Sequence, residues 1–344
     1  MAKKRKKSRG KKVLLSALCV VLGLVLAVLI GGTVWVNSFL NQIDREDAIQ
    51  ETLSDEQIQE ILNETEPEDV EFTGEVIDPE HIELGGEAEV LLGEEDHMIN
   101  ILLIGQDARP GQKRQRSDTM ILCTINTDEK TLVMTSFLRD LYVSIPDWNG
   151  KSYSNNRLNV NYAFGGMGML AECLKQNFGV VVDHSVAVDF TGFEKVINLV
   201  GGVDIELTSA EASVVGGGAR KGMNHLNGEQ ALNYARIRKL DNDFGRTNRQ
   251  RKVITALLNQ AKSLSLTELV DLVEGIMPLI STDMSNSDIM NYVGELFPLL
   301  SGLEITTQTI PADGTYKNAS VHGMSVLVPD MEANRQILQD TIGG

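Results

Sequence analysis

The chain has 344 residues, of which 42% are hydrophobic, so it can bury the core of one large domain or of two small ones. Its three cysteines are too few for a disulfide scaffold, although a single bond between Cys123 and Cys173 remains open. The formal net charge is −17 at pH 7, and it is distributed very unevenly along the chain.

Residues 1–12 form a basic tail with no acidic side chain. Removing its eight positive charges from the formal −17 leaves −25 for the remainder. Residues 13–36 carry no charge and would extend about 36 Å as a helix, enough to cross a bilayer core of roughly 30 Å. The positive-inside rule then predicts a single-pass protein of the cell membrane with a cytoplasmic N-terminus and an extracellular C-terminal domain. The alternative is a signal peptide cleaved near "LIGGTVW".

Residues 37–96 are predicted to form an acidic extracytoplasmic linker. Between Asp44 and Asp96, Arg45 is the one Lys or Arg residue. Ser54 and Gln57 have the spacing of a capping box, which predicts one short helix. The rest has too few apolar residues for a core, so we expect an extended, self-repelling spacer.

Residues 97–344 are predicted to form one extracytoplasmic catalytic domain. Its apolar runs at 98–105, 119–127 and 131–138 indicate strands, with Asp128 to Lys130 as the turn between the last two. Helical periods follow near 169–174 and 193–200, and further strands at 180–190 and 203–207. Later helices are expected at 266–280 and 288–303, and a strand at 324–330. This alternation predicts an α/β fold, a central mixed β-sheet sandwiched between helices.

A charged loop follows the first of these strands. It carries Asp107, Arg109, Arg116 and Asp118, and loops at the carboxyl ends of strands are where open α/β sheets bind ligands. Carboxylates interleaved with guanidinium groups suit Mg²⁺, or alternatively Mn²⁺, together with phosphate. The simpler alternative is a solvated loop with local ion pairs.

Two further clusters of charge lie later in the sequence. Arg139, followed by Asp140, ends the strand "VMTSFL", so it could lie on the same sheet edge. After a short helix capped by Asn227 and Gln230, the segment "RIR" places Arg236 and Arg238 on one face if it is extended.

A helix is then expected to start near Thr247. Its spacing places Arg246 and Arg249 or Gln250 above an apolar stripe, at a helix end that favours anions. Arg251 and Lys252 are expected to point elsewhere, into solvent.

Arginine is the informative residue in these clusters, because its planar fork binds phosphate oxygens in pairs. A diphosphate is therefore the expected ligand. A nucleic-acid groove would need aromatic side chains among the basic ones and would rarely face the cell exterior, so no nucleic-acid partner is expected.

The segment from about Asn100 to Ala261 resembles the LytR-CpsA-Psr family of cell-wall glycopolymer ligases. Seven blocks carry the resemblance in order: "NILLIGQDAR", "RSDTM", "SFLRDLYVSIP", "RLNVNYAFGG", "VDFTGFEKVINLVGGVDIEL", "LNGEQALNYARIR" and "DFGRTNRQRKVI". The chain departs from the family at Phe137, Leu138 and Leu141, which flank Arg139, and in the longer first loop "PGQKRQ". These departures affect local loop geometry and leave the charged residues in place.

The resemblance implies a phosphotransferase that moves a glycopolymer from a polyprenyl-diphosphate carrier in the membrane lipid onto peptidoglycan, plausibly onto the muramic acid 6-hydroxyl, with Mg²⁺ assisting. It also implies roles for individual residues. Asp107 and Asp118 would hold the metal or activate the acceptor, Arg139 would act with them, and Asn159 would support the site. The diphosphate would be held by Arg109, Arg116, Arg139, Arg236, Arg238, Arg246, Arg249 and Gln250.

Two other kinds of protein remain open on the sequence. A non-catalytic sensor of lipid-linked diphosphate would keep the arginines but would not need the paired carboxylates Asp107 and Asp118. A polyprenyl-diphosphate phosphatase would act without an acceptor, and the chain has no His, Cys or GxSxG constellation for a covalent hydrolase. The isoprenoid would need an apolar tunnel. The stripe beneath Arg246 and Arg249 and the stripe from Phe193 to Val200 are candidates for its lining, with plain core packing as the alternative.

Overall fold

The computed structural model describes residues 41, 43–45, 54, 56–58, 61, 75–106, 115–262 and 264–342. The predicted basic tail and the predicted membrane span at 13–36 lie outside these residues. Within them, no helix is both long enough and apolar enough to cross a membrane.

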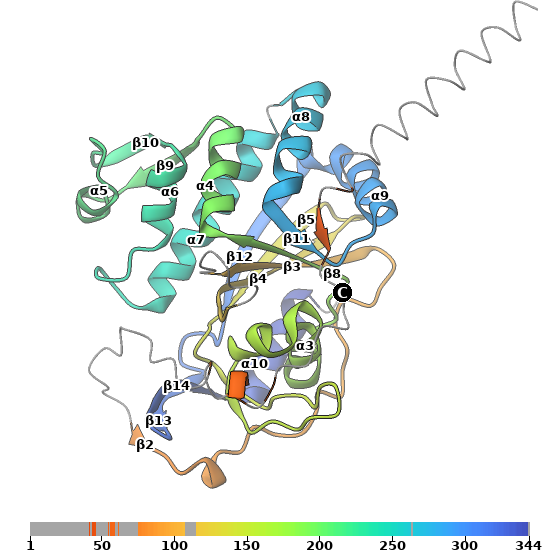
Figure 1. Ribbon diagram of the computed structural model, residues 1–344, viewed down its shortest axis with the longest axis vertical. Coiled ribbons are helices and arrows are strands. Elements are labelled where there is room, and N and C mark those ends of the chain that lie inside the picture. The colour runs from red at the N-terminus through yellow and green to blue at the C-terminus, as the bar shows by residue number, and fades with distance from the viewer. Residues whose placement is uncertain are drawn as a thin grey trace, which may run out of the picture.

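A mixed sheet forms the centre of the described chain (Figure 1). Its strand order is β1-β11-β8-β3-β4-β5-β12. β3, β4 and β5 form an antiparallel meander, while β8 runs parallel to β3 and β12 runs parallel to β5. The strands are β1 (Asp44–Arg45), β3 (Met98–Gln106), β4 (Ser117–Asn126), β5 (Thr131–Phe137), β8 (His184–Asp189), β11 (Ile280–Thr282) and β12 (Glu304–Ile310).

Helices cover both faces of this sheet (Figure 1). On one face lie α3 (Val160–Phe178) and α10 (Met331–Ile342). On the other lie α4 (Phe190–Leu199), α7 (Asp243–Ala261), α8 (Leu266–Ile276) and α9 (Asn286–Leu296). The predicted α/β fold, a mixed sheet between helices, is confirmed.

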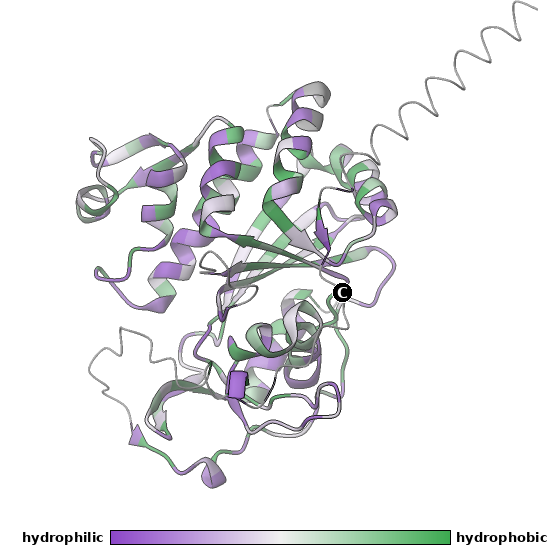
Figure 2. Cartoon of the chain, viewed as in Figure 1, coloured by the Kyte–Doolittle hydropathy of each residue, from purple (hydrophilic) through white to green (hydrophobic). Residues whose placement is uncertain are grey.

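The alternation of side chains along β4 explains the two layers. Leu122 packs into the cluster formed with α3, whereas the next residue, Cys123, packs into the cluster formed with α7 and α9. Cys173 lies in the first of these clusters, so the two cysteines are on opposite sheet faces, and both are free and buried. They are core residues and do not form a disulfide. Figure 2 shows hydrophobic residues concentrated in the sheet and in α3, as this packing requires.

A smaller unit packs beside the main sheet. It consists of the hairpin β9 (Val203–Leu207) and β10 (Gly222–Leu226) with α5 (Ser209–Val215) and α6 (Gly228–Ala235), and its core includes Ile197 of α4 and Val253 of α7. Asn227 and Gln230 form the predicted capping box at the start of α6. The connection from α6 to α7 leaves this unit and reaches the main sheet, which positions the candidate site.

The remaining elements are short. β2 (Glu75–Val76), β13 (Tyr316–Val321) and β14 (Met324–Pro329) form one small sheet, and β6 (Tyr142–Val143) pairs with β7 (Asn156–Arg157). The single-turn 3-10 helices are η1 (Pro79–His81) and η2 (Met277–Leu279), and a longer one, η3 (Phe297–Gly302), follows α9.

Two expectations about element boundaries were wrong. α7 begins at Asp243 and not near Thr247, because the Asn242 side chain accepts a bond from Gly245 N–H and caps the helix earlier. The stretch expected to be an extended spacer also contributes to the folded domain. β1 joins the central sheet beside β11, and Leu92 is buried and bridges to Val180. The capping box of Ser54 and Gln57 within that stretch is confirmed.

Candidate anion-binding site

Four arginines and three aspartates meet where β4, the end of β5 and the first turn of α7 come together. We call this group the arginine cluster, and its members are Asp118, Arg139, Asp140, Arg157, Arg238, Asp243 and Arg246. Counted over these seven described residues, the guanidinium groups outnumber the carboxylates by one. A positive excess in a largely buried group of side chains favours an anionic ligand.

Asp118 joins two of the arginines through one oxygen atom. Its Oδ1 accepts a bond of 2.8 Å from Nη1 of Arg139, and Nη2 of Arg238 lies 3.5 Å from the same atom. Arg238 comes from the segment after α6, so this carboxylate connects the smaller unit to the central sheet. Both contacts are made by Oδ1, so these two arginines leave Oδ2 for another ligand.

Arg139 is held in place from two further sides. Its Nε lies 3.5 Å from Oδ2 of Asp243 on α7 and 3.6 Å from Oδ2 of Asp140. Arg157 approaches Oδ1 of Asp140 at 3.5 Å and donates a 2.9 Å bond to the Ser325 carbonyl. The side chain of Arg139 is only 9% exposed, so its guanidinium is fixed within the cluster by carboxylates.

Arg246 is the most deeply buried arginine of the cluster. Its side chain is 3% exposed, and Nη2 donates a 3.0 Å bond to Oδ2 of Asp243. Its Nε and Nη1 atoms are buried and have no hydrogen-bond partner among the described residues. Burial, with the like charges of Arg139 and Arg238, lowers the pKa of Arg246 against the opposing effect of Asp243.

Two uncharged side chains nearby are also incompletely bonded. Asn159 donates from its backbone to Arg139 O and accepts from Ser117 N–H, and both polar atoms of its buried side chain lack a partner in the described part of the chain. Gln250 lies four residues after Arg246 on α7, and its buried Oε1 likewise has no hydrogen-bond partner among the described residues. Buried polar groups are nearly always bonded, so these atoms and those of Arg246 indicate a polar ligand or water.

This donor set is chemically suited to phosphate oxygens. Nε and Nη1 of Arg246 point to different sides of its guanidinium, so each can bind a separate phosphate oxygen, and the amide of Asn159 can add a further donor. For a metal, Asp118 offers one carboxylate oxygen, and no group of three His, Cys, Asp or Glu side chains among the described residues could hold an ion. A metal here would therefore depend on oxygens of a bound phosphate, as Mg²⁺ sites commonly do.

The other predicted site residues are not members of the arginine cluster as defined above. Arg236 is exposed and its guanidinium lies 4.2 Å from the ring centroid of Phe190, a cation–π contact at the start of α4. Arg116 donates to the carbonyl of Ile61. Asp107 and Arg109 lie outside the described residues. The stripe of Phe193, Ile197 and Val200 considered for a lipid tunnel belongs to or borders the core under α4.

Two arginines of α7 differ from expectation. Arg249 is turned away from the arginine cluster, because Nη1 and Nη2 bond to Asp241 at 2.8 and 2.6 Å and Nη2 also bonds to the Ile237 carbonyl. Arg251 was expected in solvent, which was wrong. It is buried, and its Nη1 donates to the hydroxyls of Ser136 on β5 and Thr309 on β12.

Three members of the cluster were absent from the predicted site. Asp243 precedes the helix start that the sequence predicted near Thr247, so its place in the first turn of α7 was not anticipated. Asp140 was noticed beside Arg139 but was given no role, and Arg157 lies in a two-residue strand. Only their contacts in the folded chain identify them.

Comparisons with known proteins agree with this fold. The chain matches the LytR_cpsA_psr family over residues 49–341. It is 31% identical over 261 residues to the "polyisoprenyl-teichoic acid--peptidoglycan teichoic acid transferase TagT" of Bacillus subtilis (strain 168), covering 71% of this chain and 77% of that protein. It is 30% identical over 251 residues to the "regulatory protein MsrR" of Staphylococcus aureus (strain COL), covering 71% and 74% respectively.

Solved structures resemble it as well. A structure described as "TagT bound to LIIa-WTA" superposes with a TM-score of 0.61 at 27% identity, covering 76% of this chain and 99% of that one. A structure of the protein gbs0355 from Streptococcus agalactiae gives a TM-score of 0.62 at 26% identity, covering 73% and 89%.

Proposed function

Because the chain belongs to the LytR_cpsA_psr family, we propose that it is a transferase that attaches a cell-wall glycopolymer to peptidoglycan. Relatives named as teichoic acid transferases support this role. In more detail, the donor would be a glycopolymer on a polyprenyl-diphosphate carrier. The acceptor would be a hydroxyl of peptidoglycan, the muramic acid 6-hydroxyl.

The observation that carries this proposal is the state of Arg246. A guanidinium that is 3% exposed, with two N–H-bearing atoms that find no partner in the part of the chain that the structure describes, is costly unless an anion completes it. Arg139 and Arg238 converge on the same place through Asp118. A diphosphate supplies the charge and the number of acceptor oxygens that these three arginines can bind.

The reaction that this arrangement would assist is a phosphoryl transfer. The acceptor hydroxyl oxygen attacks the phosphorus next to the glycopolymer, forming a new P–O bond, and the anhydride P–O bond on the carrier side breaks. The bond electrons leave with polyprenyl phosphate, and an aspartate takes the hydroxyl proton. The arginines stabilise the negative charge that develops on the transferred phosphoryl oxygens. Asp118 and Asp107 are the candidates for the base.

We extend the proposal to a divalent cation, Mg²⁺ or Mn²⁺. Asp118 fits one ligand position through Oδ2, and Asp107 is the second candidate on the sequence. When bound, such an ion would neutralise charge on the diphosphate oxygens. Arg139 and Arg238 would orient Asp118 in either case.

The proposal also places the protein at the cell membrane. The uncharged stretch at 13–36 would anchor the chain, with the domain outside the cell, where both the lipid-linked donor and peptidoglycan are found. A protease added to intact, wall-stripped cells should then remove the domain. Full protection of the domain would contradict this localisation.

The direct test combines the full chain in detergent with a short polyprenyl-diphosphate saccharide, Mg²⁺ and a peptidoglycan fragment. Mass spectrometry should find the saccharide phosphate joined to the fragment, and polyprenyl phosphate should appear in equal amount. Release of saccharide phosphate or inorganic phosphate without an acceptor would identify a phosphatase instead.

A regulatory role is the second candidate, because one relative is named a regulatory protein. A pure regulator would bind the polyprenyl diphosphate through the arginines and release nothing. Stable binding with no product after prolonged incubation, with and without Mg²⁺ and acceptor, would favour it over the transferase.

A further inference from the structure

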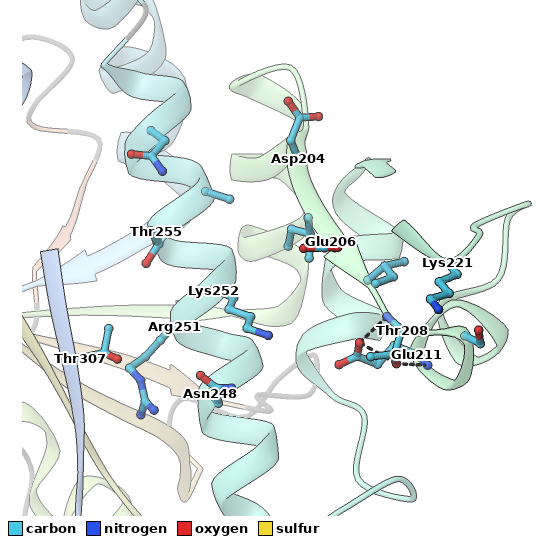
Figure 3. Close-up of a pocket in the computed structure, with 15 residues that line it drawn as sticks. Asp204, Glu206, Thr208, Glu211, Lys221, Asn248, Arg251, Lys252, Thr255 and Thr307 are labelled. Carbon is cyan, nitrogen blue, oxygen red and sulfur yellow. Dashed lines mark hydrogen bonds between the residues drawn. The ribbon is translucent and has the colours of Figure 1, made fainter. Parts of the chain in front are cut away.

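A groove of about 740 Å³ lies between β9 and α7, outside the arginine cluster (Figure 3). Its α7 wall is formed by the helix face opposite to Arg246. Asn248, Lys252, Thr255 and Asn259 follow one another at spacings of three and four residues, so they form a polar stripe along the groove. In Figure 3, Lys252 extends from α7 toward the β9 side.

The other wall is the free edge of a strand. All residues from Asp204 to Ser209 line the groove consecutively, whereas a strand that presents a face would contribute alternate residues. β9 pairs only with β10 within the described chain, so its second edge carries backbone N–H and C=O groups without strand partners. An edge strand opposite a helix is an arrangement that binds extended peptides by strand addition.

The groove has both signs of charge. Asp204 and Glu206 are exposed acidic side chains on β9, and Lys221 and Lys252 are exposed basic ones. Arg251 adds a buried positive charge that is 7% exposed and is bonded through Nη1 to the hydroxyls of Ser136 and Thr309. Its Nε is buried without a partner, and no carboxylate contacts it within the described residues. A ligand with both amine and carboxylate groups would match these walls.

The groove also lies close to the proposed reaction site. Asn248 follows Arg246 by two residues, which is about 3 Å along a helix axis, although the two side chains leave different faces of α7. A molecule in the groove would therefore reach the level of the arginine cluster at the groove's basic end.

We propose that this groove binds the peptide portion of peptidoglycan, extended along the β9 edge. Its carboxylates lie toward Arg251 and Lys252, and its amine lies toward Asp204 and Glu206. Peptidoglycan peptides are short and carry both kinds of group. This inference rests on the proposed transferase function and assigns a place to the acceptor, while the arginine cluster holds the donor.

The test is calorimetry on the full chain in detergent, with a muropeptide that has its peptide and with the same disaccharide lacking it. The muropeptide should bind more tightly, and Lys252→Glu should weaken its binding about tenfold. The control is Lys195→Glu, a charge reversal at an exposed lysine of α4 outside the groove, which should change nothing. Hydrogen exchange at residues 203–207 should slow when the muropeptide is bound.

Equal binding of the two sugars, or unchanged muropeptide affinity in Lys252→Glu, would overturn the inference. A failure of the proposed function has a different signature. The unsubstituted protein would then neither bind a polyprenyl diphosphate nor transfer a saccharide phosphate from it. Muropeptide binding that depends on Lys252 would still support the proposed role of the groove.

Discussion

Arg246 and Arg249 are three residues apart on α7 and are equally buried, yet the described residues bond the guanidinium of Arg249 more fully than that of Arg246. Within the described chain Arg249 makes three hydrogen bonds, two of them to Asp241, and only its Nε lacks a partner, whereas Arg246 makes one bond and both its Nε and Nη1 lack partners. Arg249 therefore holds the connection before α7 in place, and Arg246 is available for a ligand.

Replacing each of these arginines by methionine should separate the two roles. Arg246→Met should weaken binding of a short-chain polyprenyl diphosphate by about 1.5–3 kcal/mol, since a charge-assisted bond is lost. Its melting temperature should be unchanged or higher, because incompletely bonded buried N–H groups are removed. Calorimetry and thermal melting measure the two effects.

Arg249→Met is the matched comparison and should behave in the opposite way. It should lower the free energy of unfolding by about 1–3 kcal/mol, less than for a fully buried pair because the Asp241 side chain is 40% exposed. A large loss of melting temperature in Arg246→Met would mean that Arg246 is also a structural residue.

Asp118→Asn tests the carboxylate that joins Arg139 and Arg238. The change keeps the side chain's size but removes its charge, so transfer should fall steeply if Asp118 serves as base or metal ligand. Diphosphate binding should survive or tighten slightly as a repelling charge is lost. Turnover with excess Mg²⁺ and the melting temperature should be measured together.

Asp128→Asn, in the exposed turn between β4 and β5, provides the control for this charge removal. Asp128→Asn should change neither the turnover nor the melting temperature. If Asp118→Asn melts much earlier and loses binding and turnover in parallel, the role of Asp118 is to hold the fold. Full turnover would exclude both chemical roles.

Arg238→Lys tests whether the planar fork matters beyond its charge. Lysine retains the positive charge near Asp118 but cannot bind two oxygens side by side, so diphosphate affinity should fall by about 1–3 kcal/mol. Arg220→Lys, at an exposed position before β10, should leave the affinity unchanged. If both variants bind the diphosphate with equal affinity, the role of Arg238 is only to form the ion pair with Asp118.

His184 should give the domain a pH-dependent stability. A hydrogen bond to Asp283, 3.2 Å from Nδ1, raises the pKa of His184, and the carboxylates of Asp283, Asp288 and Asp183 act in the same direction while burial opposes them. A histidine whose pKa is higher in the folded state than in the unfolded state stabilises the fold. Its contribution to the free energy of unfolding is complete below the unfolded pKa of about 6.5 and is lost as the pH rises through the folded pKa.

His184→Gln should therefore flatten the decline in melting temperature that begins above about pH 6.5. The variant should bind a diphosphate normally, since this pair lies between β8 and the β11–α9 connection. The pKa of His225 is also raised, by bonds to Asp204 and Gly201, so His225→Gln is the parallel variant. An unaltered pH profile in His184→Gln would show that the His184–Asp283 pair contributes nothing.

The thiols of Cys123 and Cys173 should resist modification in the folded protein. Burial raises the pKa of Cys123 to about 12 and raises that of Cys173 as well, so neither forms thiolate readily near neutral pH. A thiol reagent should label both only after denaturation, without prior reduction. A requirement for a reductant would indicate a disulfide that this fold does not contain.

The sequence predicted features that depend on local chemistry. The capping boxes at Asn227 and Ser54 and the turn at Asp128 each follow from residues within four positions of one another. Arg139 was also expected at the same sheet edge as the loop that carries Asp118, because charged residues at strand ends gather there, and the two side chains do meet.

Partners chosen by tertiary packing could not be predicted in this way. Helical spacing predicts which face of α7 carries Arg251. Only the fold shows that the hydroxyls of Ser136 and Thr309 lie against that face. Arg249 likewise appears equivalent to Arg246 until Asp241 is seen beside it. Strand β1 is two residues long, which is too short for any periodic signal.

Asn41 and β1 bear on how far the domain can stand from the membrane. The Asn41 side chain accepts a bond from Asn286 at the start of α9, and β1 pairs with β11 immediately afterwards. In the proposed topology the span ends at Val36, and five residue steps of at most about 3.6 Å give a reach of about 18 Å. The acidic stretch after Arg45 connects two parts of one domain and adds nothing to this reach. Inserting residues between Val36 and Asn41 would therefore lift the arginine cluster away from lipid-borne substrate, whereas lengthening the acidic stretch would leave its height unchanged.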